Sequence, residues 1–199
     1  MKKNTLEQLS SFIYNRFTHD ATGHDYYHMK RVAITGKRLA LQEGADPVVC
    51  EIAGWLHDVM DPKLTDDPDR ERQVIIDLLR SMYVSSEVQD QIFIAMENVS
   101  FKTGHQVPTS LEGRIVQDAD RLDAMGAIGV ARAFAYGGAK GQAIHNETSE
   151  KTTIQHFYEK LLTLQSLLNT DSARKIGQQR HDFLKCYLDQ FYEEWECKN

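Results

Sequence analysis

The sequence is poor in cysteine, and its three cysteines cannot form a disulfide framework. Cys50, Cys186 and Cys197 are widely separated, and no two of them form a CxxC pair. Small secreted domains often depend on several disulfides, whereas thiols in the cytoplasm are kept reduced. We therefore expect a cytoplasmic protein.

Positive charge and long apolar runs are also scarce. The chain has 29 Asp and Glu residues against 23 Lys and Arg residues, which gives a net charge of −6. A binder of duplex nucleic acid or anionic lipid needs a basic surface. No stretch approaches the roughly 18 apolar residues that cross a membrane. We therefore expect neither a nucleic acid duplex nor a membrane as a partner.

With 12 Gly and 4 Pro, the composition gives no sign of disorder or of a collagen-like repeat, and 41% of the residues are hydrophobic. Apolar residues recur at three- and four-residue steps through most of the chain, which indicates helices. We expect an all-α protein that forms one domain and ends in two long helices. The expected helices cover residues 5–18, 25–44, 47–60, 69–82, 86–100, 109–124, 124–139, 149–169 and 172–196.

Three segments concentrate side chains that bind metals or move protons, at 24–31, 57–61 and 118–123. Each has a structural alternative, namely a capping or core histidine, a chance His-Asp pair and a solvated acidic turn. However, the apolar run at 52–56 precedes the second segment, and apolar residues surround the carboxylates of the third. Buried polar groups need partners, so these settings favour a bound cation.

The order of these residues resembles the HD superfamily of metal-dependent phosphohydrolases. The similarity consists of a His, then His-Asp, then a late Asp in the context Asp-Ala-Asp-Arg-Leu-Asp, and it extends to small bacterial HD hydrolases, including nucleoside triphosphate pyrophosphohydrolases. The stretches HFYEKLL at 156–162 and TDSARKIGQQRHDF at 170–183 also resemble that subgroup. The resemblance implies a single HD domain over 1–199. Its metal-site core would span about 20–126, and its C-terminal helical part about 147–197.

The resemblance implies that His28, His57, Asp58 and Asp120 hold one divalent metal ion. Asp120 follows from the family pattern Ala-Asp-x-Leu/Phe-Asp/Asn, and Asp118 is the alternative last ligand. Binuclear relatives add histidines after the His-Asp pair, whereas this chain reads Ala-Met-Glu-Asn at 95–98. We therefore expect one ion, Mn²⁺, with Fe²⁺, Co²⁺, Ni²⁺ or Mg²⁺ as alternatives.

Catalytic roles are expected for Asp61, Arg121 and Lys63. Asp61 follows Asp58 by three residues, and a helix would place both on one side. In mononuclear relatives an acidic residue at this offset resembles the group that positions or deprotonates the attacking water. Arg121 and Lys63 adjoin the expected ligands in sequence and would neutralise phosphate charge, although Arg121 has pairing with Asp118 as an alternative.

Three further residues are expected at the substrate. They are Arg31, His24 and Asp25. Helical spacing would place His24, His28 and Arg31 on one face. His24 and Asp25 would either contact substrate or orient His28.

The resemblance favours hydrolysis of nucleoside or deoxynucleoside triphosphates to monophosphate and pyrophosphate. The partner would be a small-molecule nucleotide or another phosphoester, and the protein a monomer or homodimer. One alternative is a nucleoside 5′-monophosphate phosphatase, and another is a non-catalytic HD module that senses nucleotides. A third is a helical domain whose His and Asp clusters are structural.

Overall fold

The computed structural model describes residues 3–18, 20, 23–62, 64–99, 106–149 and 151–198. These residues form helices, and the sole extended pairing among them is a single parallel bridge between Ala143 and Thr152. The prediction of an all-α protein is confirmed. Within this described part, no helix combines the length and the apolar character needed to cross a membrane.

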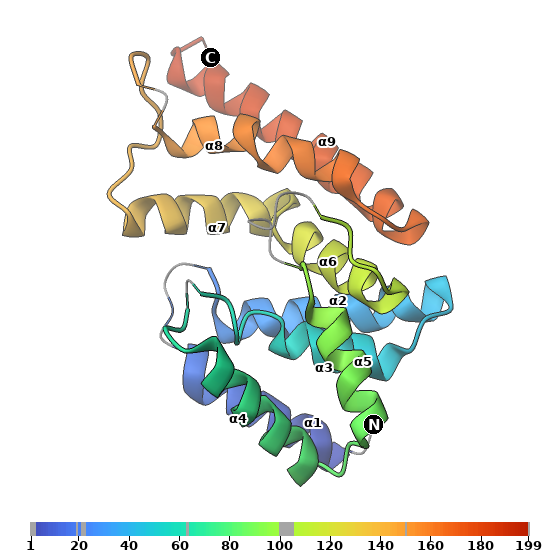
Figure 1. The fold of residues 1–199 in the computed structure, drawn as a ribbon. Helices are drawn as coiled ribbons and strands as arrows, with labels where there is room; N and C mark the ends of the chain where they lie inside the picture. Colours follow the sequence, from blue (N-terminus) through green and yellow to red (C-terminus); the bar gives the residue numbers. More distant parts are fainter. Residues whose placement is uncertain are drawn as a thin grey trace. The chain divides into compact units, whose positions relative to one another are not determined.

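The helices, which are labelled in Figure 1, include one 3₁₀-helix, η2. Their bounds are α1 (Lys3–Phe17), α2 (Tyr26–Glu43), α3 (Pro47–Leu56), α4 (Pro68–Ser81), α5 (Ser86–Met96), α6 (Leu111–Asp123), α7 (Gly126–Ala139), α8 (Thr153–Glu159), η2 (Leu161–Leu167) and α9 (Asp171–Trp195).

Local sequence signals set the ends of α2 and α3. The Asp25 carboxylate caps α2 by accepting the backbone N–H of His28 at 2.8 Å. Gly44 ends the helix with φ of 76°, a left-handed conformation that favours glycine. The Asp46 carboxylate then accepts N–H groups of the first turn of α3, behind Pro47. These caps fix where α2 begins and ends and where α3 begins.

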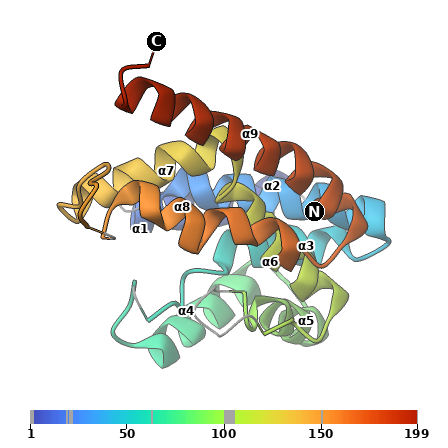
Figure 2. The same cartoon turned by 90° about the horizontal axis from the view of Figure 1, so that it is seen from above.

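The chain divides into two compact units. The first comprises Met1–Asp20 and His24–Asp120, and the second Ala21–Gly23 and Arg121–Asn199. In the first unit α2 lies along α3, α1 contacts both, and α5 packs on α3, as Figures 1 and 2 show. In the second unit α9 packs on α7 and η2, and α8 contacts α7 and η2. The chain divides into these two units, and the single domain expected over 1–199 stays a prediction.

Two predicted helices end earlier than expected. The helix expected to reach Met60 stops at Leu56, because the following N–H groups bond three residues back, from Val59 to Leu56 and from Asp61 to Asp58. Such bonds tighten the chain into turns. The helix expected over 86–100 stops at Met96, and Asn98 takes a positive φ of 57°.

The prediction of two long C-terminal helices is wrong for the first of them. The segment expected over 149–169 is the short α8 followed by η2, while α9 is long as predicted. Leucines at positions 161, 164 and 167 repeat every three residues, which matches the 3₁₀ period. The hydroxyls of Thr163 and Ser166 each donate to a carbonyl three residues back, and this competes with regular α-helix bonding.

Candidate metal centre

The first proposed ligand, His28, lies in the first turn of α2. The Asp25 cap holds the backbone of this turn, and the His28 side chain is completely buried. His24 lies before the helix begins at Tyr26. The expected shared helical face of His24 and His28 is therefore wrong in its geometry, although the two rings do meet edge to face with centroids 5.7 Å apart.

His57 and Asp58 follow the last residue of α3. The Nδ1 atom of His57 lies 2.9 Å from the carbonyl oxygen of Gly54, and a carbonyl only accepts, so this nitrogen carries the proton. When the ring is neutral, Nε2 then faces the cluster as a lone-pair donor. It is buried and finds no hydrogen-bond partner among the described residues. An imidazole fixed through one nitrogen, with the other buried and open, is the usual form of a metal-binding histidine.

Four ligand-type side chains come together here, from α2, the end of α3 and α6. Asp58 Oδ2 lies 3.5 Å from His28 Nε2 and 3.4 Å from His57 Nε2. Asp120 Oδ1 lies 3.5 Å from His28 Nε2 and 3.9 Å from His57 Nε2. Asp120 of α6 therefore lies near both histidines, and its choice over Asp118 as the last ligand stays a prediction.

Charge in the cluster favours a cation. Burial alone lowers the pKa of His57, but the negative charges of Asp58 and Asp120 outweigh burial and raise this pKa to about 9. Burial raises the pKa of Asp58, yet the positive charge of His57 and the hydrogen bond from His24 hold it well below its usual range. The buried Asp58 carboxylate thus keeps its charge because positive groups lie beside it.

The residues fit a divalent metal ion. Ligand atoms that each lie about 2.1 Å from the same ion lie about 3 Å from one another. The contacts between the ligand-type atoms of this cluster, 3.4 to 3.9 Å, are slightly longer. Two imidazoles and two carboxylates form a mixed donor set that suits Mn²⁺, Fe²⁺, Co²⁺ or Ni²⁺. His28, His57 and Asp120 have ligand atoms within 4.8 Å of one another, as do His24, His28 and Asp58.

Of the predicted catalytic residues, Asp61 is buried close in sequence to Asp58. Its N–H donates to the Asp58 carbonyl at 3.0 Å, so one tight turn links the two residues. Arg121 is also buried, and its guanidinium donates to the carbonyl of Leu167 in η2. This bond gives Arg121 a structural contact, and its role at phosphate stays a prediction. Lys63 lies outside the described residues.

The predicted substrate residues lie on or just before α2. Arg31 is half-buried, one turn along the helix from His28. Asp25 acts as the helix cap, and His24 contacts Asp58. Sequence reasoning missed the pairing of His24 with Asp58, because 34 positions separate them and no local spacing links them.

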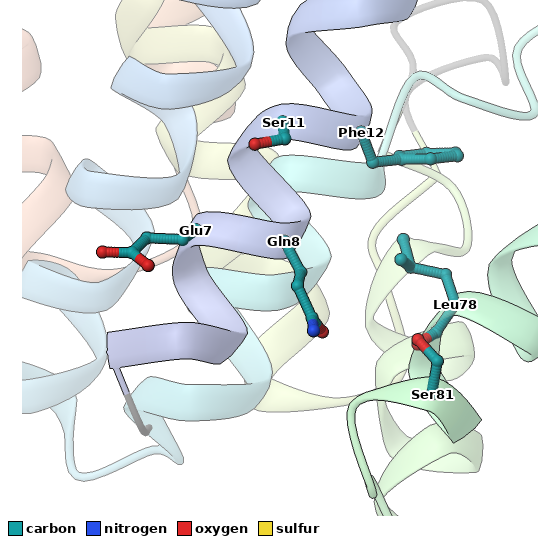
Figure 3. Close-up of a pocket in the computed structure, with 6 residues that line it drawn as sticks. All are labelled: Glu7, Gln8, Ser11, Phe12, Leu78 and Ser81. Carbon is teal, nitrogen blue, oxygen red and sulfur yellow. The ribbon is translucent and has the colours of Figure 1, made fainter.

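A hollow on the first unit offers a different environment. It has a volume of about 460 Å³ and lies between α1 and α4 (Figure 3). Phe12 and Leu78 face each other across it in that view. Its six lining residues, Glu7, Gln8, Ser11, Phe12, Leu78 and Ser81, include one carboxylate and no histidine, so the chemistry lies in the His and Asp cluster instead.

Comparison with known proteins identifies the family. The family model described as "HD domain" matches residues 25–125, which include the whole cluster. YpgQ of Bacillus subtilis (strain 168) is 36% identical over 191 residues, which cover 94% of this chain and 92% of that protein. The chain belongs to the HD domain family. The expectation of an HD-domain metal-dependent phosphohydrolase is thereby confirmed at the level of the family.

Solved structures of similar proteins share the fold. An HD-superfamily hydrolase from Bacillus thuringiensis is 37% identical with a TM-score of 0.81, covering 98% of this chain and 99% of that one. A protein from Lactobacillus plantarum is 36% identical with a TM-score of 0.82, covering 99% of both chains. Bacillus subtilis YpgQ in complex with ADP is 33% identical with a TM-score of 0.82, covering 94% and 96%.

Proposed function

We propose that this HD-domain protein hydrolyses nucleoside or deoxynucleoside triphosphates to monophosphates and pyrophosphate. The observation that carries the proposal is the cluster of the buried His28, His57 and Asp58 with the partly exposed Asp120, in which His57 Nε2 has no hydrogen-bond partner among the described residues. The ADP bound to YpgQ supports a nucleotide as the ligand. The proposed compartment is the cytoplasm, and the proposed state a monomer or homodimer.

The four side chains of the cluster would hold one divalent ion, with Mn²⁺ the expected metal. When bound, such an ion draws electron density from a phosphoryl oxygen and makes a nearby water more acidic. The two carboxylates offset its charge, and the Gly54 carbonyl keeps the His57 ring in the tautomer that ligation needs. The protein's contribution is thus a preorganised donor set.

Asp61 would act as the general base. Asp61 belongs to the tight turn that begins at Asp58, so its backbone lies close to the proposed ligand. In the proposed reaction, the oxygen of water bonds to the α-phosphorus and its proton passes to Asp61. The bond from that phosphorus to the bridging oxygen breaks, and pyrophosphate leaves.

Cations are needed for the phosphate charge, since a transferring phosphoryl group spreads charge over several oxygens. We assign this role to Arg31, Lys63 and Arg121. Arg31 projects from the helix that carries His28, and Arg121 follows Asp120 in α6. Asp25 and His24 lie beside this set and would either contact substrate or orient the ligands.

The test is a panel of nucleoside mono-, di- and triphosphates with Mn²⁺, in which orthophosphate and pyrophosphate are measured separately. Wild-type protein should release pyrophosphate from triphosphates. Loss of a residue that only supports a ligand typically lowers activity by about 10- to 100-fold. Asp58→Ala removes a proposed ligand itself, so it should lower the activity by more than this. Asp90→Ala, an exposed aspartate on α5, is the matched control and should keep the activity.

Other outcomes would contradict the proposal. Orthophosphate released from monophosphates would instead identify a nucleotide phosphatase. Metal and nucleotide binding without turnover would identify a sensing module. Failure of wild-type protein to bind Mn²⁺ would make the His and Asp cluster structural.

A further inference from the structure

One strong hydrogen bond joins the proposed metal cluster to a residue outside the four ligands. His24 Nδ1 lies 2.7 Å from Asp58 Oδ2, which is the shortest contact measured to that oxygen. A carboxylate only accepts, so the His24 ring donates its Nδ1 proton. His28 and His57 face the same oxygen from 3.5 and 3.4 Å. Oδ2 therefore lies among three imidazoles, and His24 is the one whose distance is that of a hydrogen bond.

The His24 ring is held in place by its surroundings. Its backbone N–H donates to Asp20 Oδ1 at 3.1 Å, which fixes the chain before α2. The ring meets the buried His28 ring edge to face, at an angle of 88°. The His24 side chain remains 25% exposed, so the contact forms at the edge of the buried cluster. A donor restrained in this way can restrain its acceptor in turn.

Asp58 needs such a restraint because no helix fixes it. It lies beyond Leu56, the last residue of α3, where bonds to the third residue back have replaced helical bonds. Its carboxylate must turn one oxygen toward both histidines for an ion to bind among them. A charge-assisted hydrogen bond to that oxygen opposes rotation of the carboxylate.

We propose that His24 is a positioning residue that orients Asp58 for metal binding. The inference rests on the proposed metal centre and separates His24 from the residues that contact substrate. His24 then raises metal affinity without being a ligand itself. The alternative that His24 Nδ1 coordinates the ion directly, as a third nitrogen ligand beside His28 and Asp58, predicts a different response to substitution.

The test compares His24→Ala and His24→Asn. Alanine removes the donor, whereas the asparagine amide places an N–H close to where Nδ1 lies. Mn²⁺ affinity is measured without nucleotide, by the electron paramagnetic resonance signal of unbound Mn²⁺, and kcat and KM are then measured at saturating Mn²⁺. His181→Ala on α9, in the second unit, is the matched control.

We expect His24→Ala to weaken Mn²⁺ binding by about 10- to 100-fold, the effect typical of losing a partner that orients a ligand. His24→Asn should recover most of that affinity, and KM for nucleotide at saturating Mn²⁺ should stay within twofold. His181→Ala should change neither quantity. A circular dichroism spectrum of each variant without metal checks that the helices have formed.

Three results would overturn the inference. Unchanged Mn²⁺ affinity in His24→Ala would show that the bond does not orient Asp58. Equal loss in both variants would make His24 a direct ligand, and a raised KM with normal metal affinity would make it a substrate contact. These outcomes differ from failure of the proposed function, in which wild-type protein binds no Mn²⁺. If Mn²⁺ binds but nucleotides are not hydrolysed, the affinity comparison still decides the inference.

Discussion

The proposed general base, Asp61, can be separated from the ligands by one substitution. Asn at position 61 keeps the size of the side chain but cannot accept a proton. We expect Asp61→Asn to lower kcat for pyrophosphate release by about 100- to 10,000-fold, the usual contribution of a general base. Mn²⁺ affinity should stay within a few-fold, because the four ligands remain.

The measurement pairs steady-state kinetics with Mn²⁺ titration of the same protein. Asp90→Asn on α5 is the control for replacing an exposed aspartate by its amide. Near-normal kcat in Asp61→Asn would remove Asp61 from the chemistry. A collapse of metal affinity would instead make Asp61 part of the metal centre.

At the scale of single residues, the sequence predicted the members of the cluster better than their contacts. The ordered resemblance named His28, His57, Asp58 and Asp120, and the structure brings them together. The bond of Arg121 to the carbonyl of Leu167 spans 46 positions, and only the tertiary fold creates such a contact. No periodicity or spacing in the chain encodes it.

The close packing of α3 on α2 is an element-scale feature that supports the site. A Cβ atom at Gly54 would lie 2.7 Å from Ala33 Cα and 2.9 Å from Ala33 N, so it would collide with the backbone of α2. Backbone cannot yield as a flexible side chain does. His28 lies on α2 and His57 follows α3, and the His57 Nδ1–H donates a hydrogen bond to the Gly54 carbonyl.

Gly54→Ala should therefore destabilise the protein by about 1–3 kcal/mol through overpacking and should also weaken Mn²⁺ binding. Gly138→Ala on α7 is the matched control, since nothing lies within 4 Å of a Cβ there. Its free energy of unfolding should be unchanged or up to about 1 kcal/mol higher, because alanine favours helix. Denaturant unfolding measures both. Equal stability of the two variants would show that α3 can move away from α2.

Helix ends illustrate which element-scale features the sequence specifies. The caps Asp25, Gly44 and Asp46 act on their own turns, so local signals predicted them. The break between α8 and η2 has a weaker signal, because leucines spaced by three residues also fit one face of an α-helix. The structure places Leu161 and Leu164 in the core through a 3₁₀ path, and burial of these side chains decides the backbone.

At the scale of the whole molecule, all-α composition was predictable and the division into two units was not. The boundary falls between Asp120 and Arg121, inside the continuous helix α6. Sequence signals for domain boundaries are loops and linkers rich in Pro, Gly or polar residues. A boundary inside a regular helix carries none of them, so only packing reveals it.

All four proposed metal ligands belong to the first unit, which leads to a prediction about where metal stabilises the chain. A ligand that binds only the folded state stabilises it by about 2.7 kcal/mol when the ligand concentration is 100 times its Kd. This free energy lowers the equilibrium constant for opening by about 100-fold. Mn²⁺ should thus slow amide hydrogen exchange by up to about 100-fold in α2 and α3, whose opening disrupts the ligand set.

Exchange followed by mass spectrometry, with Mn²⁺ and with a chelator, checks this prediction. Amides of α8 and α9 in the second unit should change far less if they open locally, because such openings leave the ligand set intact. Asp58→Ala is the control, and Mn²⁺ should protect none of its helices. Equal slowing in both units would mean that they unfold together, so that the metal stabilises the molecule as one cooperative body rather than the unit that binds it.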